Sequence, residues 1–239
     1  MKRKTLLRWL AITDTAVSAV LAYRYYLLPR IRNSGATPAE VERPMPGDEL
    51  VSRPVMEGTH GITIAAPPDA IWPWLVQIGY GRAGFYSYEW IERLMGLPIV
   101  NEDRVSPEYS RLAVGDVVPF GPGDDIGLPV IALEPHRFLC LGGAMASGIV
   151  TWCFGLYPVD PTHTRLVSRN RAFAPGWTLA SILGRPASWR VELPMKIFFD
   201  PGSFLMVRKM LLGIKQRAER DAAERKAEEA ALVLSSGCE

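Results

Sequence analysis

Residues 62–96 read ITIAAPPDAIWPWLVQIGYGRAGFYSYEWIERLMG, and they predict one strand and two short helices in succession. The opening ITI alternates apolar and polar residues, as a strand does. A helix is expected to begin at Pro67-Pro68, because prolines are tolerated in a first helical turn. Pro73 is expected to kink that helix without ending it. Beyond the glycines of residues 79–84, a second helix with a serine cap is expected over residues 87–95.

After these helices the pattern changes to short apolar runs separated by turns, which predicts an antiparallel meander. The expected strands lie at residues 114–120, 129–133, 138–142, 149–157 and 164–173. Residues 174–199 mix prolines and glycines with apolar runs and could form a helix, a strand or a lid.

The last predicted element is a long amphipathic helix that begins at residues 200–203. It places an apolar stripe on one face. From Arg217 onward the stripe is expected to end and charged pairs to continue into solvent. The stripe consists of Phe204, Val207, Leu211 and Ile214, with Met206 and Met210 beside it.

The order of strand, two helices, meander and long C-terminal helix resembles the SRPBCC superfamily, whose START-like, polyketide cyclase-related members have the helix-grip fold. Residues 62–96 resemble the opening of its bacterial members. RPMPGDELV (43–51), NEDRVSPEYSRLAVGDVV (101–118), TRLVSRNRA (164–172) and MLLGIKQRAE (210–219) look like segments of one subgroup, so the likeness covers residues 35–219. It implies an α+β fold with a curved antiparallel sheet. The superfamily includes lipid and hormone binders, transfer proteins, aromatic cyclases and oxygenase domains.

Residues 1–32 are predicted to form a separate apolar helix that anchors the protein to a bacterial membrane. As a helix, residues 6–28 would span about 34 Å, enough for a bilayer core of about 30 Å. Asp14 argues against a span, because an acid near a helix centre is costly in a bilayer. A stripe of small residues beside it favours self-association. A cleaved signal peptide and an amphipathic surface helix are the alternatives.

The remaining chain divides into three predicted parts. Residues 33–57 are rich in proline and glycine and suggest a linker. Within them, Thr37 and Glu40 have the spacing of a helix-capping box. Residues 58–216 form the START-like ligand-binding domain, and residues 217–239 form a charged helical extension with a tail.

The basic residues concentrate at the N-terminus. Seven of the 27 basic residues and one of the 25 acidic residues lie in residues 1–32, so the rest of the chain carries 20 bases against 24 acids. A nucleic-acid footprint would need a basic patch on the folded body, and the sequence shows none. A basic end beside an apolar run favours a membrane surface as partner.

Neither cysteines nor histidines predict a cofactor or metal site. Cys140 and Cys153 lie in apolar runs and are expected to be buried small side chains without a disulfide. The histidines at 60, 136 and 163 are scattered without metal-ligand spacing. Residues 79–84 match G-x-G-x-x-G, but the motif follows a helix and not a strand, so a tight turn is preferred over a dinucleotide site.

Aromatic residues supply most of the candidates for lining a ligand cavity, because apolar side chains dominate such sites. Packing in the core is the alternative for each of them. Tyr86 and Tyr88 lie about 200° apart on a helical turn, so only one can face inward, and Tyr86 is our choice. The further candidates are Trp72, Trp90, Trp152, Met206 and Met210.

Two polar pairs complete the candidate site. Asp103 and Arg104 follow the second helix and could orient the polar end of a ligand, or Asp103 could act as a base. Loop capping and a surface ion pair are the alternative, which we prefer. Arg169 and Arg171 lie two apart on a predicted strand and share one sheet face. On the inner face they would need an anionic partner, so we expect them to face solvent.

Three functions remain open. The first is a carrier or sensor that binds a hydrophobic or lipid-like small molecule. The second is an enzyme of the cyclase or dehydratase kind that folds a reactive chain in the same cavity. The third is a membrane-tethered interaction protein with a filled core. The sequence favours the first, because no acid–base constellation stands out.

Overall fold

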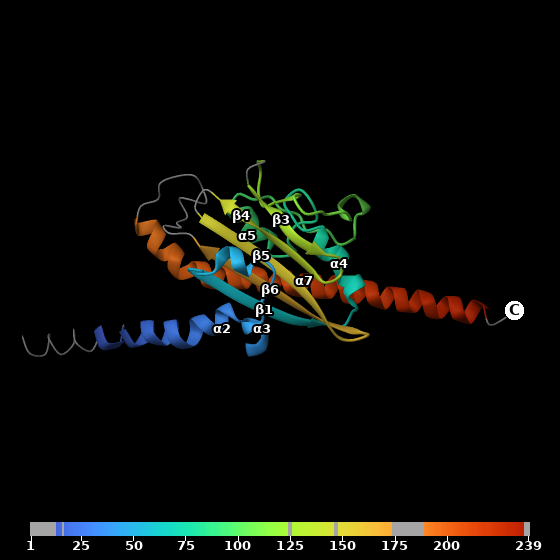
Figure 1. Cartoon of the computed structure of the whole chain (residues 1–239), viewed down its shortest axis with the longest axis horizontal. Coiled ribbons are helices and arrows are strands. Elements are labelled where there is room, and N and C mark those ends of the chain that lie inside the picture. The colour runs from blue at the N-terminus through green and yellow to red at the C-terminus, as the bar shows by residue number, and fades with distance from the viewer. Residues whose placement is uncertain (1–12, 16, 124–125, 146–147, 174–188, 237–239) are drawn as a thin grey trace, which may run out of the picture.

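The structure is a computed structural model, and it describes residues 13–15, 17–123, 126–145, 148–173 and 189–236. One six-stranded antiparallel sheet lies against a long C-terminal helix and shorter helices (Figure 1). This is the α+β helix-grip arrangement that the sequence predicts.

The sheet has the strand order β1-β6-β5-β4-β3-β2, and all neighbouring strands are antiparallel. The first strand therefore pairs with the last, while the others follow one another as a meander. Each of the five predicted runs overlaps one strand, so the meander is confirmed. The strands are β1 (Met56–Ile64), β2 (Val117–Pro119), β3 (Gly127–Glu134), β4 (Phe138–Met145), β5 (Gly148–Asp160) and β6 (His163–Phe173).

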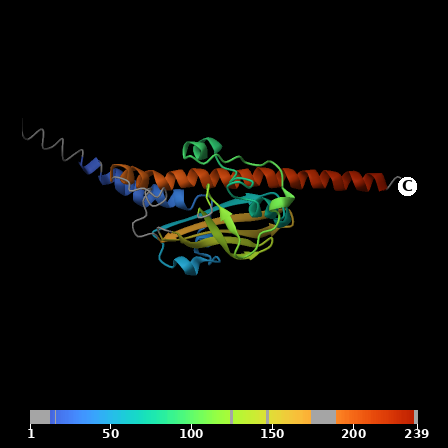
Figure 2. The same cartoon turned by 90° about the horizontal axis from the view of Figure 1, so that it is seen from above.

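Helices α4 (Pro68–Val76) and α7 (Trp189–Ser236) pack on one face of the sheet, which we call the inner face. Figure 2 shows α7 running along this side of the strands. The core lies between the two layers, because the strands direct alternate apolar side chains inward. Its members from the strands include Val130, Leu139, Leu141, Phe154, Leu156 and Leu166.

The two short helices form where the sequence places them. Pro68 opens α4 and Pro73 lies inside it, as predicted. Helix α5 (Glu89–Leu94) has Tyr88 at its N-cap position, without a side-chain hydrogen bond, so the predicted serine cap is wrong. The buried Ser87 hydroxyl instead donates to the Glu92 carboxyl group. Burial raises the pKa of Glu92, and the hydrogen bond from Ser87 opposes that rise.

Helix α7 is longer than predicted at its start. It begins at Trp189 and continues through residues 200–203, so the predicted start there is wrong. Its buried stripe of Val207, Leu211 and Ile214 is confirmed. The stripe also continues past Arg217, since Ala218 and Ala222 are buried as well. Residues 174–188, whose structure the sequence left open, lie outside the described residues.

Residues 33–57 differ from the predicted linker: residues 40–51 pack against the opposite, outer face of the sheet, and Met56 and Glu57 already belong to β1. Residues 33–57 contain α3 (Pro38–Glu42) and η2 (Asp48–Val51). The predicted capping box is confirmed: Thr37 Oγ1 accepts from the Glu40 amide at 3.2 Å, and Glu40 Oε2 accepts from the Thr37 amide at 2.7 Å.

Arg169 fastens this segment to the sheet. Its side chain is only 2% exposed, and its guanidinium group makes five hydrogen bonds of 2.7–3.0 Å. A guanidinium group has five N–H donors, so all of them can be satisfied. The expectation that Arg169 faces solvent is therefore wrong. The acceptors are Thr59 Oγ1, Asp48 Oδ2 and the carbonyl oxygens of Glu40, Val41 and Arg43.

Two further arginines on β6 contact the same segment and its surroundings. Arg165 forms an ion pair with buried Glu40 at 2.6 Å, and Arg171 forms one with Glu57 at 2.7 Å. Arg171 is thus also covered and not free in solvent, contrary to expectation. Burial alone would raise the pKa of Glu40, but Arg165 and the Thr37 amide lower it.

Cys140 and Cys153 lie opposite each other on β4 and β5, with Cα atoms 4.0 Å apart, and they form a disulfide. Both are buried, as expected. The expectation that they stay unpaired is wrong, because strand register brings together two residues separated by 13 positions. Cys238 lies outside the described residues.

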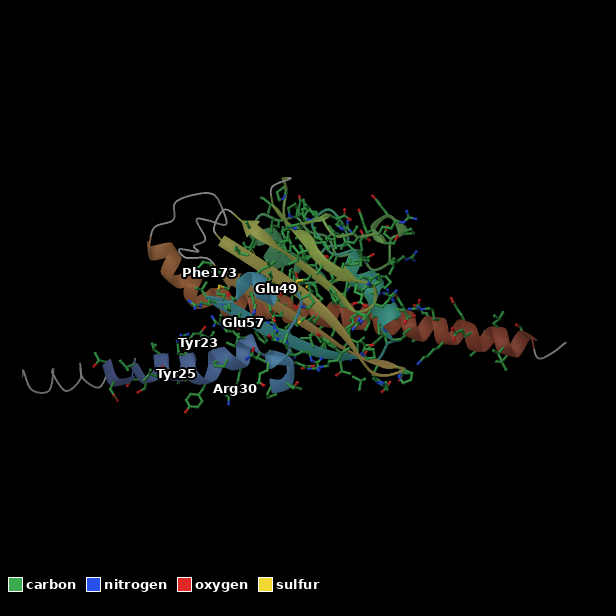
Figure 3. All side chains as sticks on the ribbon, viewed as in Figure 1. Tyr23, Tyr25, Arg30, Glu49, Glu57 and Phe173 are labelled. Atoms are coloured by element: carbon green, nitrogen blue, oxygen red, sulfur yellow. A yellow bond between two sulfur atoms is a disulfide. The ribbon has the colours of Figure 1, made fainter. Side chains whose placement is uncertain are left out.

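The N-terminal helix extends away from the sheet (Figure 1). Residues 13–15 and 17–22 are helical, and the helix continues through η1 (Tyr23–Leu27) and α2 (Leu28–Arg32). Figure 3 labels Tyr25 on this helix, outside the folded body, and its side chain is 69% exposed. No helix in the described part of the chain is long and apolar enough to cross a membrane. Residues 1–12, where the predicted anchor begins, lie outside that part.

Candidate functional site

Four aromatic rings meet on the inner face of the sheet and form what we call the inner-face cluster. Trp152 and Phe154 extend from β5 with ring centroids 5.0 Å apart. Phe85, from the loop after α4, stacks on Phe120 at 5.2 Å. Trp152 joins the two pairs, because its ring lies 5.7 Å from Phe120 and 6.2 Å from Phe85. Phe85, Trp152 and Phe154 are buried members of the hydrophobic core, and Phe120 packs against it.

Polar groups adjoin this cluster from the neighbouring strands. The Trp152 indole N–H donates to Ser168 Oγ on β6 at 2.9 Å. His60 lies directly opposite Ser168 on β1. Its ring is 6.1 Å from the ring of Phe204 on α7, which places the histidine between sheet and helix. The two strands therefore bring a serine and a histidine to the same edge of the inner face.

His60 is a buried group with an unused hydrogen-bonding atom. The residue is 6% exposed, and among the described residues its Nδ1 has no partner. Buried polar atoms are normally hydrogen-bonded, so an exception calls for a physical explanation, such as a ligand group or a water molecule. Burial lowers the pKa of His60 from 6.5 to about 4, so the ring is neutral near physiological pH.

His60 is expected to make the protein less stable in acid. Because its folded pKa of about 4 lies below the ordinary 6.5, the unfolded chain binds the proton more readily. The contribution of the neutral ring is fully present above pH 6.5 and is lost as the pH falls towards 4. The shift corresponds to about 3 kcal/mol.

Urea unfolding from about pH 4 to about pH 7 measures this effect. His60→Phe should flatten the dependence of the unfolding free energy on pH, whereas His163→Gln at the start of β6 should preserve it. If the His60→Phe curve keeps the wild-type slope, the buried histidine does not govern acid stability.

Tyr86, our choice for the inward tyrosine, is buried as expected, with 1% of its surface exposed. Its hydroxyl oxygen accepts from Gln77 Nε2 at 2.8 Å, so a protein group already uses it. The ring packs edge-on against Trp74 at 5.7 Å, and the Arg217 guanidinium lies 4.8 Å from its centre. Burial raises the pKa of Tyr86, which keeps the phenol protonated. These contacts join α4 to α7.

Four other candidates lie nearer the surface. Tyr88 is half-buried, with Lys209 Nζ 5.7 Å from its ring, and Trp90 beside it is 64% exposed. The Asp103 carboxylate forms an exposed ion pair with Arg217 at 2.5 Å, which confirms the surface interpretation. Arg104 is exposed as well. The structure therefore does not bring Trp90, Asp103 or Arg104 to the inner face.

The remaining candidates pack in the interface of helices and sheet. Trp72 on α4 is 8% exposed, and its ring lies 5.8 Å from that of His136. Met210 on α7 is buried in the core, while Met206, one turn earlier, is half-buried. Of the nine predicted residues, Trp152 alone belongs to the inner-face cluster.

The glycine-rich motif forms a tight turn, as preferred. Gly79 and Gly84 are joined by an isolated antiparallel bridge after the end of α4. Gly84 has a positive φ of +74°, and an added Cβ would lie 2.6 Å from the Asn101 side chain. Only glycine fits such a close approach without strain. A dinucleotide site requires this motif to follow a strand and to open a helix, and here it does neither.

A polar surface cleft of about 270 Å³ lies between α4 and α7. Asp69 and Arg225 on opposite walls of the cleft form an ion pair at 3.7 Å. The cleft is lined by Asp69, Ala70, Pro73, Val105, Asp221, Glu224, Arg225 and Glu228.

Among the described residues, no group of histidines, cysteines and acids has a metal-binding arrangement.

Sequence reasoning missed Phe120, Phe154, Ser168 and His60 as parts of one site. Phe154 could have been predicted from the sequence, because a residue two positions from Trp152 lies on the same face of the strand. The pairing of His60 with Ser168 could not have been predicted in this way, because it depends on the register of β1 against β6.

No protein-family model matches the chain, and no curated protein matches it. Solved structures do resemble it. An aromatase/cyclase from Streptomyces sp. R1128 is 13% identical, with 71% of this chain and 94% of that chain covered, at a TM-score of 0.38. Protein MLL2253 from Mesorhizobium loti is 18% identical over 69% of this chain and 98% of its own, at 0.37.

Aha1 from Colwellia psychrerythraea, described as a dimer, is 15% identical over 69% of this chain and 97% of its own, at a TM-score of 0.36. The helix-grip fold of this chain is established by its own strand order and helix packing.

Proposed function

We propose that the protein binds a hydrophobic or lipid-like small molecule between the inner face of the sheet and α7, as a carrier or sensor. One observation carries the proposal: an aromatic cluster shares this face with a buried histidine whose Nδ1 has no partner among the described residues. Small-molecule sites are typically apolar surfaces with a few polar groups that orient the ligand. The chemistry fits an apolar molecule with an uncharged hydrogen-bonding group.

An enzyme of the cyclase or dehydratase kind is the second candidate. His60 beside Ser168 favours it, because proton transfer needs a positioned group with a free acceptor atom. A histidine with a pKa of about 4 is, however, a weak base near neutral pH. The carrier is therefore the better-supported function. A tethered interaction protein without ligand is the third candidate, and it predicts no uptake of an apolar probe.

Replacing Trp152 should weaken binding of an environment-sensitive apolar dye by about tenfold or more, because one ring joins the whole inner-face cluster. Trp90→Ala is the matched control, since Trp90 is a 64% exposed tryptophan that should leave binding unchanged. Fluorescence titration measures both affinities, and thermal melting checks that Trp152→Ala remains folded. If Trp152→Ala does not fold, the milder variant Trp152→Phe is used in its place. Equal affinities in the two variants would contradict the placement of the site.

We propose in addition that residues 1–32 hold the protein at a bacterial membrane. Apolar side chains on the described part of this helix support the proposal, because they are 49–69% exposed. Their burial at a lipid surface would remove them from water. The same surface would also suit self-association of two helices. These side chains are Val17, Val20, Leu21, Tyr25, Tyr26 and Leu27.

Cell fractionation tests the tether. The full chain should sediment with membranes after a high-salt wash, whereas a chain that begins at residue 33 should be released, because it lacks the apolar helix. Recovery of the full chain in the soluble fraction would show that residues 1–32 do not act as a tether. Cross-linking in the membrane fraction would report pairing of the helices.

A further inference from the structure

Two sulfur atoms lie sealed beneath residues 43–52, which we call the cover. The cover packs on the outer face of the sheet, opposite the inner-face cluster. Cys140 and Cys153 below it are 0% and 2% exposed. Met45 and Val167 pack around them in a small apolar cluster. The disulfide is therefore reached only when the cover moves.

The backbone of the cover touches both sulfurs. The Pro46 carbonyl oxygen lies 3.0 Å from Cys140 Sγ and 2.8 Å from Cys153 Sγ. Within the described part of the chain, no other group donates a hydrogen bond to this carbonyl. Gly47 has a φ of +86°, and an added Cβ would lie 2.7 Å from Cys140 Sγ. Position 47 therefore favours glycine, because a side chain there would meet the sulfur and the backbone has a positive φ.

Whether the Pro46 carbonyl oxygen can accept hydrogen bonds from the two sulfurs depends on whether the cysteines are reduced or joined in a disulfide. A thiol is a weak donor, so two reduced cysteines can each donate an S–H to the Pro46 carbonyl. A disulfide carries no proton, so the same carbonyl then faces two sulfurs without a donor. A buried acceptor without a donor is unfavourable, and here it is part of the cover.

We propose that Cys140 and Cys153 form a reversible dithiol–disulfide pair whose redox state sets how firmly the cover is held on the sheet. The reduced pair holds the cover through the Pro46 carbonyl, and oxidation loosens it.

The oxidant is a low-molecular-weight disulfide that reacts by thiol–disulfide exchange. One cysteine thiolate attacks it, forms a mixed disulfide and releases one small thiol. The second cysteine thiolate then attacks the protein sulfur of that mixed disulfide and releases the second small thiol. Two protein thiols are thus oxidised while one small disulfide is reduced, and the reverse exchange restores the thiols.

Hydrogen exchange of the full chain, measured by mass spectrometry, tests the proposal. The Cys238→Ser background prevents exchange with the third cysteine. The protein is compared after incubation with reduced dithiothreitol and with oxidised glutathione, and a loss of 2 Da from the oxidised intact protein verifies its state. Backbone amides of the cover should exchange about 5- to 10-fold faster in the oxidised protein. Amides of β5 and β6 away from the pair should change little.

Two double variants separate the hydrogen bonds from other effects of the sulfurs. Cys140→Ser with Cys153→Ser retains two donors without redox chemistry, so the cover should exchange slowly under both conditions. Cys140→Ala with Cys153→Ala removes the donors, so exchange should be fast under both. The wild-type comparison stands by itself if either variant fails to fold. Free thiols that persist in the oxidant, or equal exchange of the cover in both wild-type states, would overturn the proposal.

Discussion

Arg169→Leu is expected to lower the free energy of unfolding by about 3–5 kcal/mol. The substitution leaves the carboxylate of Asp48 without its 2.7 Å partner. It also strips donors from three backbone carbonyls of residues 40–43 that the guanidinium satisfies. Unpaired buried groups are costly, because each loses water without gaining a partner. The segment on the outer face should therefore detach first.

Arg137→Leu is the matched control for this experiment. Arg137 also pairs with an acid, Glu134 at 2.6 Å, but its side chain is 70% exposed. Exposed pairs contribute about 0–1 kcal/mol, so chemical denaturation should register almost no change. Similar losses for Arg169→Leu and Arg137→Leu would mean that the outer-face segment is not fastened by Arg169.

Leu211→Ala is expected to lower the free energy of unfolding by about 2–5 kcal/mol. Leu211 is 4% exposed on the buried stripe of α7, where truncation leaves a cavity against the core. Its neighbour Leu212 is 40% exposed, so Leu212→Ala should cost much less. Urea unfolding of the two variants compares a buried and an exposed leucine on one helix.

Deleting residues 225–239 is expected to cost less than about 1 kcal/mol. The buried stripe ends at Ala222, and the ion pair between Arg225 and Asp69 is long, at 3.7 Å. The two residues are about half exposed, so water screens the pair. If this deletion destabilises the protein as much as Leu211→Ala, the division of α7 into a packed part and a solvated part is incorrect.

The arrangement of strands and helices was predictable because it depends on local patterns. The prolines at 67 and 68, the alternation within strands and the turns between them each mark an element in a few residues. The start of α7 was not predictable in this way. Asp200-Pro201-Gly202 carries the signals of a helix start, yet the helix runs through it from Trp189.

The faces of the sheet were harder to assign than its strands. Alternation shows that Arg169 and Arg171 share a face, but not what covers that face. The covering residues 33–57 lack an apolar period, because polar contacts to those arginines and a few buried side chains such as Met45 hold them. The disulfide and the pairing of His60 with Ser168 depend in the same way on strand register.

Native mass spectrometry of the full chain, extracted gently from cells, tests whether a ligand is bound between the sheet and α7. We expect a bound apolar molecule that adds a defined mass, leaves on denaturation and is lost or depleted in Trp152→Ala but not in Trp90→Ala. A spectrum that shows only the polypeptide mass, even after incubation with a cellular lipid extract, would contradict a ligand site between the sheet and α7.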